Sequence, residues 1–363
     1  MESNQSSFHG SDLEVISQKY RISQDSIQPF ASNVNPLGMS PVARQACIEY
    51  IDALQSYPDR NYVRLRTAIS NYCQTDMNHI ILGNGTSELI RLAFQTLQPK
   101  KTLILGPTYS EYKNAAVLYG SEVDMYMLNQ LDDFELDLPK FTDYLNDSFD
   151  FLILCNPNNP TSKALKKEDI RTILDVCSQH HIFVMIDETY VEFVQDVSVI
   201  SSVSLTQTFD NLLVLRSTSK FFSTPGLRLG YALTGNQDLL NATDSTKVPW
   251  NINSLASIAS VMFSDEHFMN LTTSLIQTER NLIYSALCSR KTIKVFKPDA
   301  NFVLIKLLRE DITSTDVFEY CLKRGLMIRD CADYEGLGNK YIRFCFLKPE
   351  QNDTVVNTIL EIV

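Results

Sequence analysis

The chain has 363 residues, of which 44% are hydrophobic and 21% are charged, and its formal net charge is −11. This composition predicts a globular protein with room for two domains. With 32 basic residues, nucleic-acid binding is not expected, because contact with a phosphate backbone requires a basic surface. No apolar run approaches the roughly 20 residues of a membrane span, and the first residues, MESNQSSFHGSD, lack the features of a signal peptide.

The eight cysteines form no CxxC pair, and several lie in apolar runs such as FLILC and RFCF. Cysteines in such runs are typical of buried free thiols. We therefore expect a protein of the reducing cytoplasm, with no metal site.

The predicted elements begin after a polar stretch that ends in turn-forming residues, NVNPLG at 33–38. Helices are expected after Pro41 and over 63–72. From residue 80 short apolar runs alternate with helical patterns, and the predicted strands are 80–82, 102–105, 151–155, 181–186 and 212–215. This alternation predicts an open, mostly parallel α/β sheet sandwiched by helices.

The pattern changes after residue 245. A long helical stretch is expected over 254–287, followed by the strands and helices of a smaller α+β unit, at 292–296, 301–307, 315–324, 326–329, 341–346 and 353–362. We therefore expect three parts: an N-terminal arm, 1–40, that joins the small domain; a large domain, 41–245; and a small C-terminal domain, 246–363.

The segment that follows the fifth predicted strand reads STSKFFSTPGLRLGY and presents Lys220 and, eight residues later, Arg228. A lysine at the end of a buried strand is placed for Schiff-base chemistry with a carbonyl group, and a nearby arginine can clamp an anion. Taken alone, Lys220 has a second interpretation, as an ordinary exposed loop lysine.

Other strand ends also carry polar residues, each with an ordinary alternative. Gly85, Thr86 and Ser87 open a helix and can form a phosphate cradle or a plain N-cap. Asp187 ends an apolar strand and is either an ordinary cap or a buried acid paired with a cation. Asn159 lies in a turn, where asparagine is common anyway, and Tyr109 is either a core residue or a stacking platform. Arg329 and Arg343 end predicted strands and can equally be surface ion-pair partners.

Together these residues favour a site for pyridoxal 5′-phosphate. That cofactor requires a lysine for a Schiff base, an acid that keeps its pyridine nitrogen protonated, an anion cradle and an aromatic ring to stack on it. In an open α/β sheet such groups meet at the carboxyl ends of the strands.

With these residues assembled, the chain resembles the fold-type I pyridoxal-phosphate enzymes of the class I/II aminotransferase superfamily. The matching segments are GNGTSE, PTY, NPNNPT, DETY and STSKFFSTPGLRLGY, in family order. The resemblance implies a seven-stranded large domain and a homodimer in which Tyr57 reaches the neighbouring site. One departure is Ser162, where the family usually has glycine, so this turn is expected to differ slightly.

The resemblance also implies roles for individual residues. Lys220 would hold the cofactor, Asp187 would pair with the pyridine nitrogen, and Arg343 would grip the substrate carboxylate. Tyr190 and Asn159 would bind the ring oxygen, and Tyr109 would stack on the ring. The residues implied around the phosphate are Gly85, Thr86, Ser87, Ser217 and Arg228.

Within the superfamily two branches that act on phosphorylated amines are most similar: histidinol-phosphate aminotransferases and L-threonine O-3-phosphate decarboxylases of cobalamin synthesis. Four segments resemble the decarboxylases: FHG at 8–10, FASNVNPLG at 30–38, PWNINSLA at 249–256, and RDCADYEGL at 329–337, which is similar to RSCANYPGL. By this match His9, Asn33 and Arg329 would meet the substrate phosphate. His9 can alternatively be a solvated terminal histidine.

The expected function is therefore decarboxylation of L-threonine O-3-phosphate to aminopropanol phosphate. A substrate with both a carboxylate and a phosphate needs two cationic anchors, and Arg329 and Arg343 can supply them. The alternatives are an aminotransferase of histidinol phosphate or a related amino acid with 2-oxoglutarate, and a non-catalytic pyridoxal-phosphate-binding protein.

Overall fold

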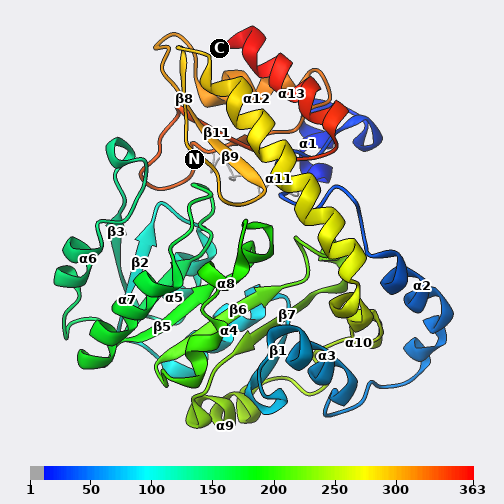
Figure 1. Cartoon of the computed structure of the whole chain (residues 1–363), viewed down its shortest axis with the longest axis vertical. Helices are drawn as coiled ribbons and strands as arrows, with labels where there is room; N and C mark the ends of the chain where they lie inside the picture. Colours follow the sequence, from blue (N-terminus) through cyan, green and yellow to red (C-terminus); the bar gives the residue numbers. More distant parts are fainter. Residues whose placement is uncertain (1–11) are drawn as a thin grey trace, which may run out of the picture.

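The computed structural model describes residues 12–363, which form a larger lower part and a smaller upper part (Figure 1). The lower part is built on a seven-stranded sheet, and its strands are β1 (Ile80–Asn84), β2 (Lys101–Gly106), β3 (Glu122–Met127), β4 (Phe151–Cys155), β5 (Phe183–Asp187), β6 (Leu212–Ser217) and β7 (Leu229–Leu233). Their order is β1-β7-β6-β5-β4-β2-β3. Only β7 runs antiparallel to its neighbours, so the predicted mostly parallel α/β sheet is confirmed.

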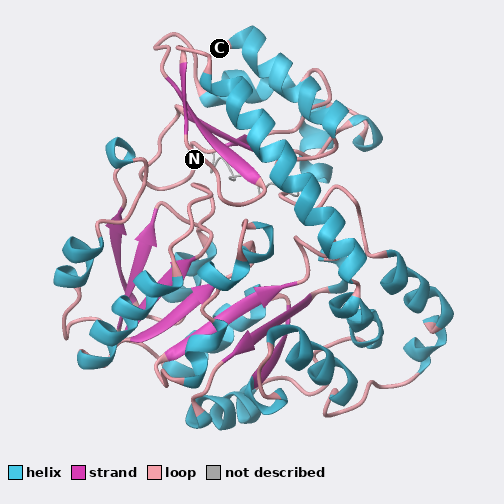
Figure 2. Cartoon of the chain, viewed as in Figure 1, coloured by secondary structure: helices cyan, strands magenta, loops and turns pink. Residues whose placement is uncertain are grey.

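Thirteen α-helices are present in the described part of the chain, and strands and helices are distinguished in Figure 2. Their bounds are α1 (Leu13–Tyr20), α2 (Pro41–Glu49), α3 (Val63–Cys73), α4 (Thr86–Leu97), α5 (Glu111–Leu118), α6 (Leu138–Tyr144), α7 (Lys167–Gln179), α8 (Val197–Ile200), α9 (Gln237–Thr246), α10 (Ser254–Ile258), α11 (Glu266–Cys288), α12 (Ser314–Leu322) and α13 (Pro349–Ile362).

The large sheet is buried on both faces. Successive strand residues point to opposite faces, so Leu152 and Val184 join one buried cluster, with residues of α3, α6 and α7, whereas Ile153 and Met185 join another, with residues of α4, α5 and α9. This explains why the strands read as continuous apolar runs and not as alternating patterns.

The upper part holds a four-stranded antiparallel sheet of order β10-β11-β9-β8. Its strands are β8 (Ile293–Val295), β9 (Phe302–Leu307), β10 (Arg329–Asp330) and β11 (Tyr341–Cys345). The segment before α2 joins this sheet, because Gln28 bridges to Leu326 and the Cys345 amide donates to the carbonyl of Phe30 at 2.8 Å. Of the predicted strand 326–329, only its last residue lies in β10.

The helical stretch expected over 254–287 is divided. Helix α10 is followed by a 3-10 helix, Ala259–Ser264, and α11 begins after Asp265. One oxygen of Asp265 caps α11 by accepting from the Phe268 amide at 3.1 Å, and the other accepts from Ser40 Oγ at 2.6 Å. Because aspartate favours an N-cap over a helix interior, it starts a new helix here. Helix α11 then runs from the lower part to the upper part (Figure 1).

All eight cysteines are free thiols, and five of them are buried. No helix among residues 12–363 is both long and apolar enough to cross a membrane.

Candidate active site

The candidate residues of the large sheet meet at the carboxyl ends of its parallel strands. Asp187 ends β5, where it lies in register with Cys155 of β4 and Leu215 of β6. Asn159 and Lys220 follow β4 and β6 by a few residues. Strands that run parallel present their carboxyl ends at one edge, so the topology alone brings these side chains together.

A cavity of about 310 Å³ lies at this edge, and we call it the inner cavity. Its lining includes every residue that the sequence assigned to the cofactor except Tyr57. The lining residues are Gly85, Thr86, Ser87, Tyr109, Tyr112, Cys155, Asn159, Asp187, Thr189, Tyr190, Ser217, Ser219, Lys220, Pro225, Arg228 and Leu229.

One end of the inner cavity is built to receive an anion. The N-terminus of α4 opens there at Thr86, preceded by Gly85 at φ +79°, and unpaired helix N–H groups favour negative charge. The guanidinium of Arg228 lies so close that a Cβ on Gly85 would be 2.4 Å from Nη2. Glycine is therefore required by both the backbone conformation and the arginine. Ser217 Oγ and Ser219 Oγ, 2.6 Å apart, add hydroxyl groups.

Lys220 lies at the junction of the sheet with the N-terminal segment. Its Nζ donates a hydrogen bond to the carbonyl of Ser32 at 2.7 Å. Burial, assisted by the positive charges of Arg343 and Arg228, lowers the pKa of Lys220 to about 8. A lowered pKa increases the neutral amine fraction near neutral pH, which is the form that attacks a carbonyl carbon.

Asp187 is a buried acid held by three hydrogen bonds. It accepts from Tyr112 Oη at 2.8 Å and from the backbone amide and hydroxyl of Thr189 at 3.0 and 2.6 Å. Burial raises the pKa of Asp187, and the hydrogen bonds from Thr189 and Tyr112 oppose that rise. No Lys or Arg of the described chain forms an ion pair with this carboxylate, so it fits a protonated pyridine nitrogen, a cation that the cofactor would bring.

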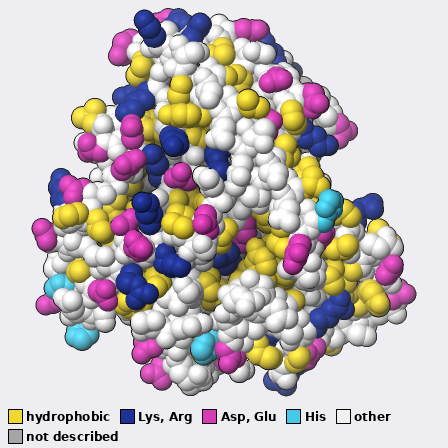
Figure 3. Space-filling model, viewed as in Figure 1, with side chains coloured by type: hydrophobic (Ala, Val, Ile, Leu, Met, Phe, Trp, Pro, Cys, Tyr) yellow, Lys and Arg dark blue, Asp and Glu magenta, His cyan; other side chains and the backbone are white. Residues whose placement is uncertain are grey.

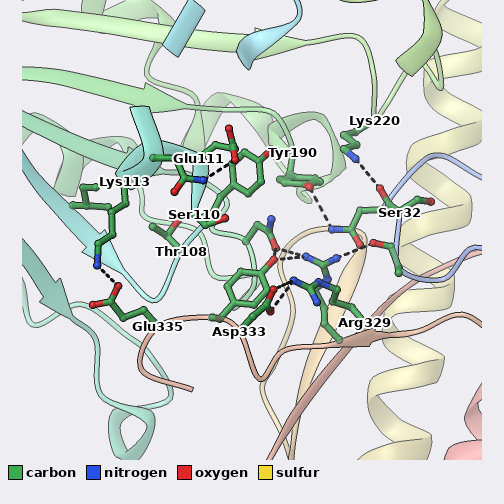
Figure 4. Close-up of a pocket in the computed structure, with 18 of the residues that line it drawn as sticks. Ser32, Thr108, Ser110, Glu111, Lys113, Tyr190, Lys220, Arg329, Asp333 and Glu335 are labelled. Carbon is green, nitrogen blue, oxygen red and sulfur yellow. Dashed lines mark hydrogen bonds and ion pairs between the residues drawn. The ribbon is translucent and has the colours of Figure 1, made fainter. Parts of the chain in front are cut away.

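A second cavity, of about 250 Å³, opens towards the small sheet, and we call it the outer cavity (Figure 4). It shares the side chains of Tyr109, Asn159, Tyr190 and Lys220 with the inner cavity. The rest of its lining is Ala31, Ser32, Asn33, Ile104, Thr108, Ser110, Glu111, Lys113, Asn114, Met125, Arg329, Asp333, Tyr334, Glu335 and Arg343. The structure thus brings Asn33, Arg329 and Arg343 together beside Lys220.

Arg343 of β11 is buried, with 3% of its surface exposed. Its Nη1 donates to Asn159 Oδ1 and to Tyr334 Oη, and its Nη2 donates to the carbonyl of Ala31 at 2.8 Å. Its Nε is buried without a partner, and no carboxylate in residues 12–363 forms an ion pair with it. A buried cation without a counter-ion costs several kcal/mol, so the arrangement calls for an anionic ligand.

Arg329 lies in β10 beside Arg343, with which it is in register. Unlike Arg343, it is already paired, because its Nη2 lies 2.7 Å from both carboxylate oxygens of Asp333. Asn33 Nδ2 donates to Tyr190 Oη at 3.3 Å, and Asn33 Oδ1 is buried without a partner. The two arginines therefore present different electrostatic conditions to a ligand.

Two predicted site residues lie elsewhere. Tyr57 borders neither cavity; its side chain is 80% exposed and packs on Trp250, with ring centroids 4.8 Å apart. His9 lies outside the described residues.

Ser162, in place of the usual glycine, takes a left-handed conformation with φ +62°. Its hydroxyl accepts from the Ala300 amide at 3.0 Å. This position favours glycine, and the hydrogen bond to the segment before β9 offsets part of the cost of a side chain.

The sequence interpretation missed several lining residues. Tyr112 follows Tyr109 by three positions, and the two rings meet edge to face with centroids 5.6 Å apart, a spacing typical of one helical turn. Thr189 follows Asp187 by two positions, the spacing of an Asx turn. Lys113, Tyr334 and the acids that pair with the cations of the outer cavity gave no such local signal.

The space-filling view shows basic and acidic side chains interspersed around the hollow between the upper and lower parts (Figure 3). A site lined by arginine and lysine can therefore exist in a chain of net charge −11, because the net charge does not fix how the charged groups are distributed.

Comparison with known proteins gives one family. The family model "Aminotransferase class I and II" matches residues 26–359. The chain is 30% identical over 358 residues to threonine-phosphate decarboxylase of Salmonella typhimurium, which covers 98% of this chain and 97% of that protein. It is 28% identical to histidinol-phosphate aminotransferase of Methanosphaera stadtmanae, over 98% of this chain and 95% of that protein. The crystal structure of histidinol-phosphate aminotransferase from Clostridium acetobutylicum superposes with a TM-score of 0.85 at 32% identity, over 92% of this chain and 98% of that one.

Proposed function

This chain belongs to the aminotransferase class I and II family, a family of pyridoxal phosphate-dependent enzymes, and we propose that it decarboxylates L-threonine O-3-phosphate to aminopropanol phosphate. The observation that carries the proposal is the placement of Arg329 and Arg343 in one cavity beside Lys220. Two bidentate cations suit a substrate that bears a phosphate and a carboxylate. The 30% identity to a threonine-phosphate decarboxylase adds support.

The inner cavity would hold the cofactor. Lys220 is the residue to hold it covalently, and Asp187 would pair with its pyridine nitrogen. The N-terminus of α4, with Thr86 and Arg228, would bind its phosphate. Bound pyridoxal phosphate would supply an electron sink for the bond of the α-carbon that is broken.

The remaining cofactor contacts come from the walls that the two cavities share. Tyr190 and Asn159 would bind the ring oxygen, and Tyr109 would stack on the ring. Gly85, Ser87 and Ser217 complete the proposed phosphate site, Gly85 by leaving room for the arginine and the two serines by their hydroxyl groups.

The outer cavity would orient the substrate. Arg343 binds the carboxylate and so fixes which bond of the α-carbon is presented for cleavage, while Arg329 and Asn33 bind the phosphate. Carbon dioxide then leaves, and a proton must be added to the α-carbon. Lys220, whose pKa in the ligand-free protein is lowered to about 8 mainly by burial, is the residue beside the α-carbon that would hold and deliver that proton. His9 remains a predicted third phosphate contact.

We also propose that the chain forms a homodimer in which Tyr57 reaches the neighbouring site. The stretch of sequence that contains Tyr57 carries further exposed apolar side chains, on α2, on α3 and on the segment between them: Val42, Ile48, Tyr50, Ile51, Leu54 and Val63. Exposed apolar surface of this kind is typical of a protein interface. Sedimentation at several concentrations tests this proposal, and a monomer at all of them would contradict it.

The division into an arm (1–40), a large domain (41–245) and a small domain (246–363) is likewise a proposal. It is supported by the location of each sheet within one of these ranges and by the pairing of Gln28 with Leu326.

An aminotransferase that acts on histidinol phosphate with 2-oxoglutarate is the second candidate. The specific observation in its favour is the superposition on histidinol-phosphate aminotransferase of Clostridium acetobutylicum, with 32% identity and a TM-score of 0.85. Both reactions use Lys220, but only decarboxylation releases CO₂.

One pair of assays separates the two functions. The holoenzyme is incubated with threonine phosphate, and separately with histidinol phosphate and 2-oxoglutarate, while CO₂ and glutamate are measured. We expect CO₂ from threonine phosphate. Glutamate without CO₂ would reject the decarboxylase in favour of the aminotransferase. Serine phosphate is a useful third substrate, because the extra methyl group of threonine changes binding by only about 1–3 kcal/mol.

A further inference from the structure

The connection between β10 and β11 places two carboxylates on two cations of the outer cavity. Asp333 pairs with Arg329, and Glu335 pairs with Lys113 of α5 (Figure 4). All four side chains line the outer cavity. A phosphorylated ligand that enters this cavity therefore meets cations that are already occupied.

Arg329 is largely engaged by its own connection. Its Nη2 lies 2.7 Å from Asp333 Oδ1 and 2.7 Å from Oδ2, and its Nη1 donates to the carbonyl of Asp330. A guanidinium has five N–H donors on three nitrogens, and both of the terminal nitrogens of Arg329 already donate to groups of this chain. A phosphate can take the paired donors only by replacing Asp333.

Lys113 is engaged in the same way from the opposite side of the cavity. Its Nζ lies 2.6 Å from Glu335 Oε2 and makes the contact across 222 residues of sequence. The pair joins α5, which packs on the large sheet, to the connection of the small sheet. Lys113 has no established part in the site, but it is the second cation of the outer cavity, after Arg329, that a carboxylate of this connection occupies.

The acids are placed where they can be displaced. The side chains of Asp333 and Glu335 are 31% and 55% exposed, so each can turn into water without leaving a buried charge. Tyr334, between them, donates to Asn159 Oδ1 at 3.0 Å and accepts from Arg343 Nη1 at 3.2 Å. The connection therefore stays anchored while its two carboxylates move.

We propose that Asp333 and Glu335 are built-in competitors of the substrate phosphate, which displaces them from Arg329 and Lys113, and that Lys113 is a further phosphate-binding residue. A phosphate monoester has three acceptor oxygens and a charge near −2, against two oxygens and −1 for a carboxylate. The exchange thus favours a ligand that carries a phosphate over one that carries only a carboxylate, so the two acids would make the cavity more selective for phosphorylated ligands. It rests on the proposed function only in that the substrate carries a phosphate.

The test measures binding of inorganic phosphate to the holoenzyme by calorimetry, without turnover. Asp333→Asn is expected to lower the Kd of phosphate about tenfold, because a neutral amide cannot compete for the guanidinium. Glu335→Gln is expected to lower it by a smaller factor, since that ion pair is more exposed. Lys113→Gln is expected to raise the Kd.

Two comparisons distinguish competition from a general change of charge. Asp330→Asn removes the same charge from the end of β10, next to Arg329, at a side chain that bonds Thr315 and Ala332 and does not line the cavity, so the Kd should not change. In an Arg329→Gln background, Asp333→Asn should give no gain.

The opposite results overturn the proposal. If Asp333 instead orients Arg329 for the phosphate, Asp333→Asn will weaken binding or leave it unchanged. A gain of equal size in Asp330→Asn would also contradict direct competition. The binding measurement does not depend on turnover. A failure to release CO₂ from threonine phosphate would therefore reject the proposed function without affecting the conclusion on phosphate binding.

Discussion

The inner and outer cavities share a wall but treat their cations differently. In the inner cavity neither Lys220 nor Arg228 forms an ion pair with a carboxylate of the described residues, whereas in the outer cavity Arg329 and Lys113 do. Arg343 lines the outer cavity but resembles the inner set, since it also lacks a carboxylate. A cation of the site without a counter-ion marks a place where the ligand brings the negative charge, whereas a paired cation marks a place where the ligand has to compete.

The largest expected effect comes from Lys220, on the wall shared by both cavities. Lys220→Ala should reduce turnover by on the order of 10⁴-fold or more, because the covalent anchor and the proton donor are lost together. The visible absorption of the bound cofactor should disappear in the same variant, measured by spectrophotometry. Lys167→Ala, an exposed lysine that bonds Ser198, is the control. Turnover that survives in Lys220→Ala would contradict its assignment.

Arg343 tests whether its charge serves the ligand or the fold. Arg343→Gln should lower kcat/KM for threonine phosphate on the order of 100-fold, because a charge-assisted contact to the carboxylate is lost. Since no carboxylate of the described chain is left unpaired, the free energy of unfolding should stay the same or rise.

Arg216 is the matched contrast to Arg343. It is buried and ion-paired with Glu188 and Glu192 at 2.9 and 2.8 Å. Arg216→Gln leaves buried carboxylates without a partner and should lower the free energy of unfolding by about 3 kcal/mol or more. Chemical denaturation of both variants measures the difference. Equal destabilisation would show that the contrast between paired and unpaired arginines is wrong.

Tyr112 tests the inner cavity without a change of formal charge. Tyr112→Phe removes the hydrogen bond to Asp187 Oδ2, which helps to lower the pKa of that acid. The carboxylate should then pair less well with the pyridine nitrogen, and the Kd of pyridoxal phosphate for the apoenzyme should rise about tenfold. Tyr119→Phe, at the end of α5, is the control. An unchanged Kd would mean that Thr189 alone holds Asp187.

The smallest expected effect is a shift of pH dependence that links the two cavities. In the apoenzyme the pKa of Lys220 is lowered from 10.5 to about 8, so the rate of covalent capture of added pyridoxal phosphate should rise with pH and reach half its maximum near pH 8. Arg343 contributes to that lowering, second to burial. Arg343→Gln should therefore move the midpoint upward, by less than the shift that burial causes. A downward movement would have the wrong sign for a charge effect.

The same Lys220 shift has a defined consequence for stability. The folded state binds fewer protons than the unfolded state between pH 8 and 10.5, so the cost of burying a protonated amine is fully present below about pH 8. It is relieved as the pH rises through this interval.

The inner cavity could be predicted from the sequence because its residues follow directly after apolar runs. Asp187 and Lys220 each lie at or just beyond the end of a strand, and parallel topology brings strand ends together. Strand β7 was not predicted, although its residues, LGYAL, are all buried. The first three residues of β7 also end the motif STSKFFSTPGLRLGY, so no separate apolar run marks this strand.

The outer cavity could be predicted only in part. Arg329 and Arg343 were identified, but the ion pairs that neutralise Arg329 and Lys113 join segments with no common periodicity. In the motif RSCANYPGL, which 329–337 resembles, asparagine and proline stand where this chain has Asp333 and Glu335. Asp333 and Glu335 thus add two charges to this motif, and only their distances to Arg329 and Lys113 show which groups those charges bind.

The connection that carries Asp333, Tyr334 and Glu335 also bears on how this enzyme could be altered. It is fixed at both ends by antiparallel pairing of β10 with β11, and it contributes no residue to the inner cavity. Exchange of Asp333 and Glu335, with Tyr334 kept on Asn159, would therefore change what the outer cavity accepts while leaving the lining of the inner cavity in place. Positions 333 and 335 are therefore suitable for directed evolution of substrate preference, because substitutions there do not alter the residues that line the inner cavity.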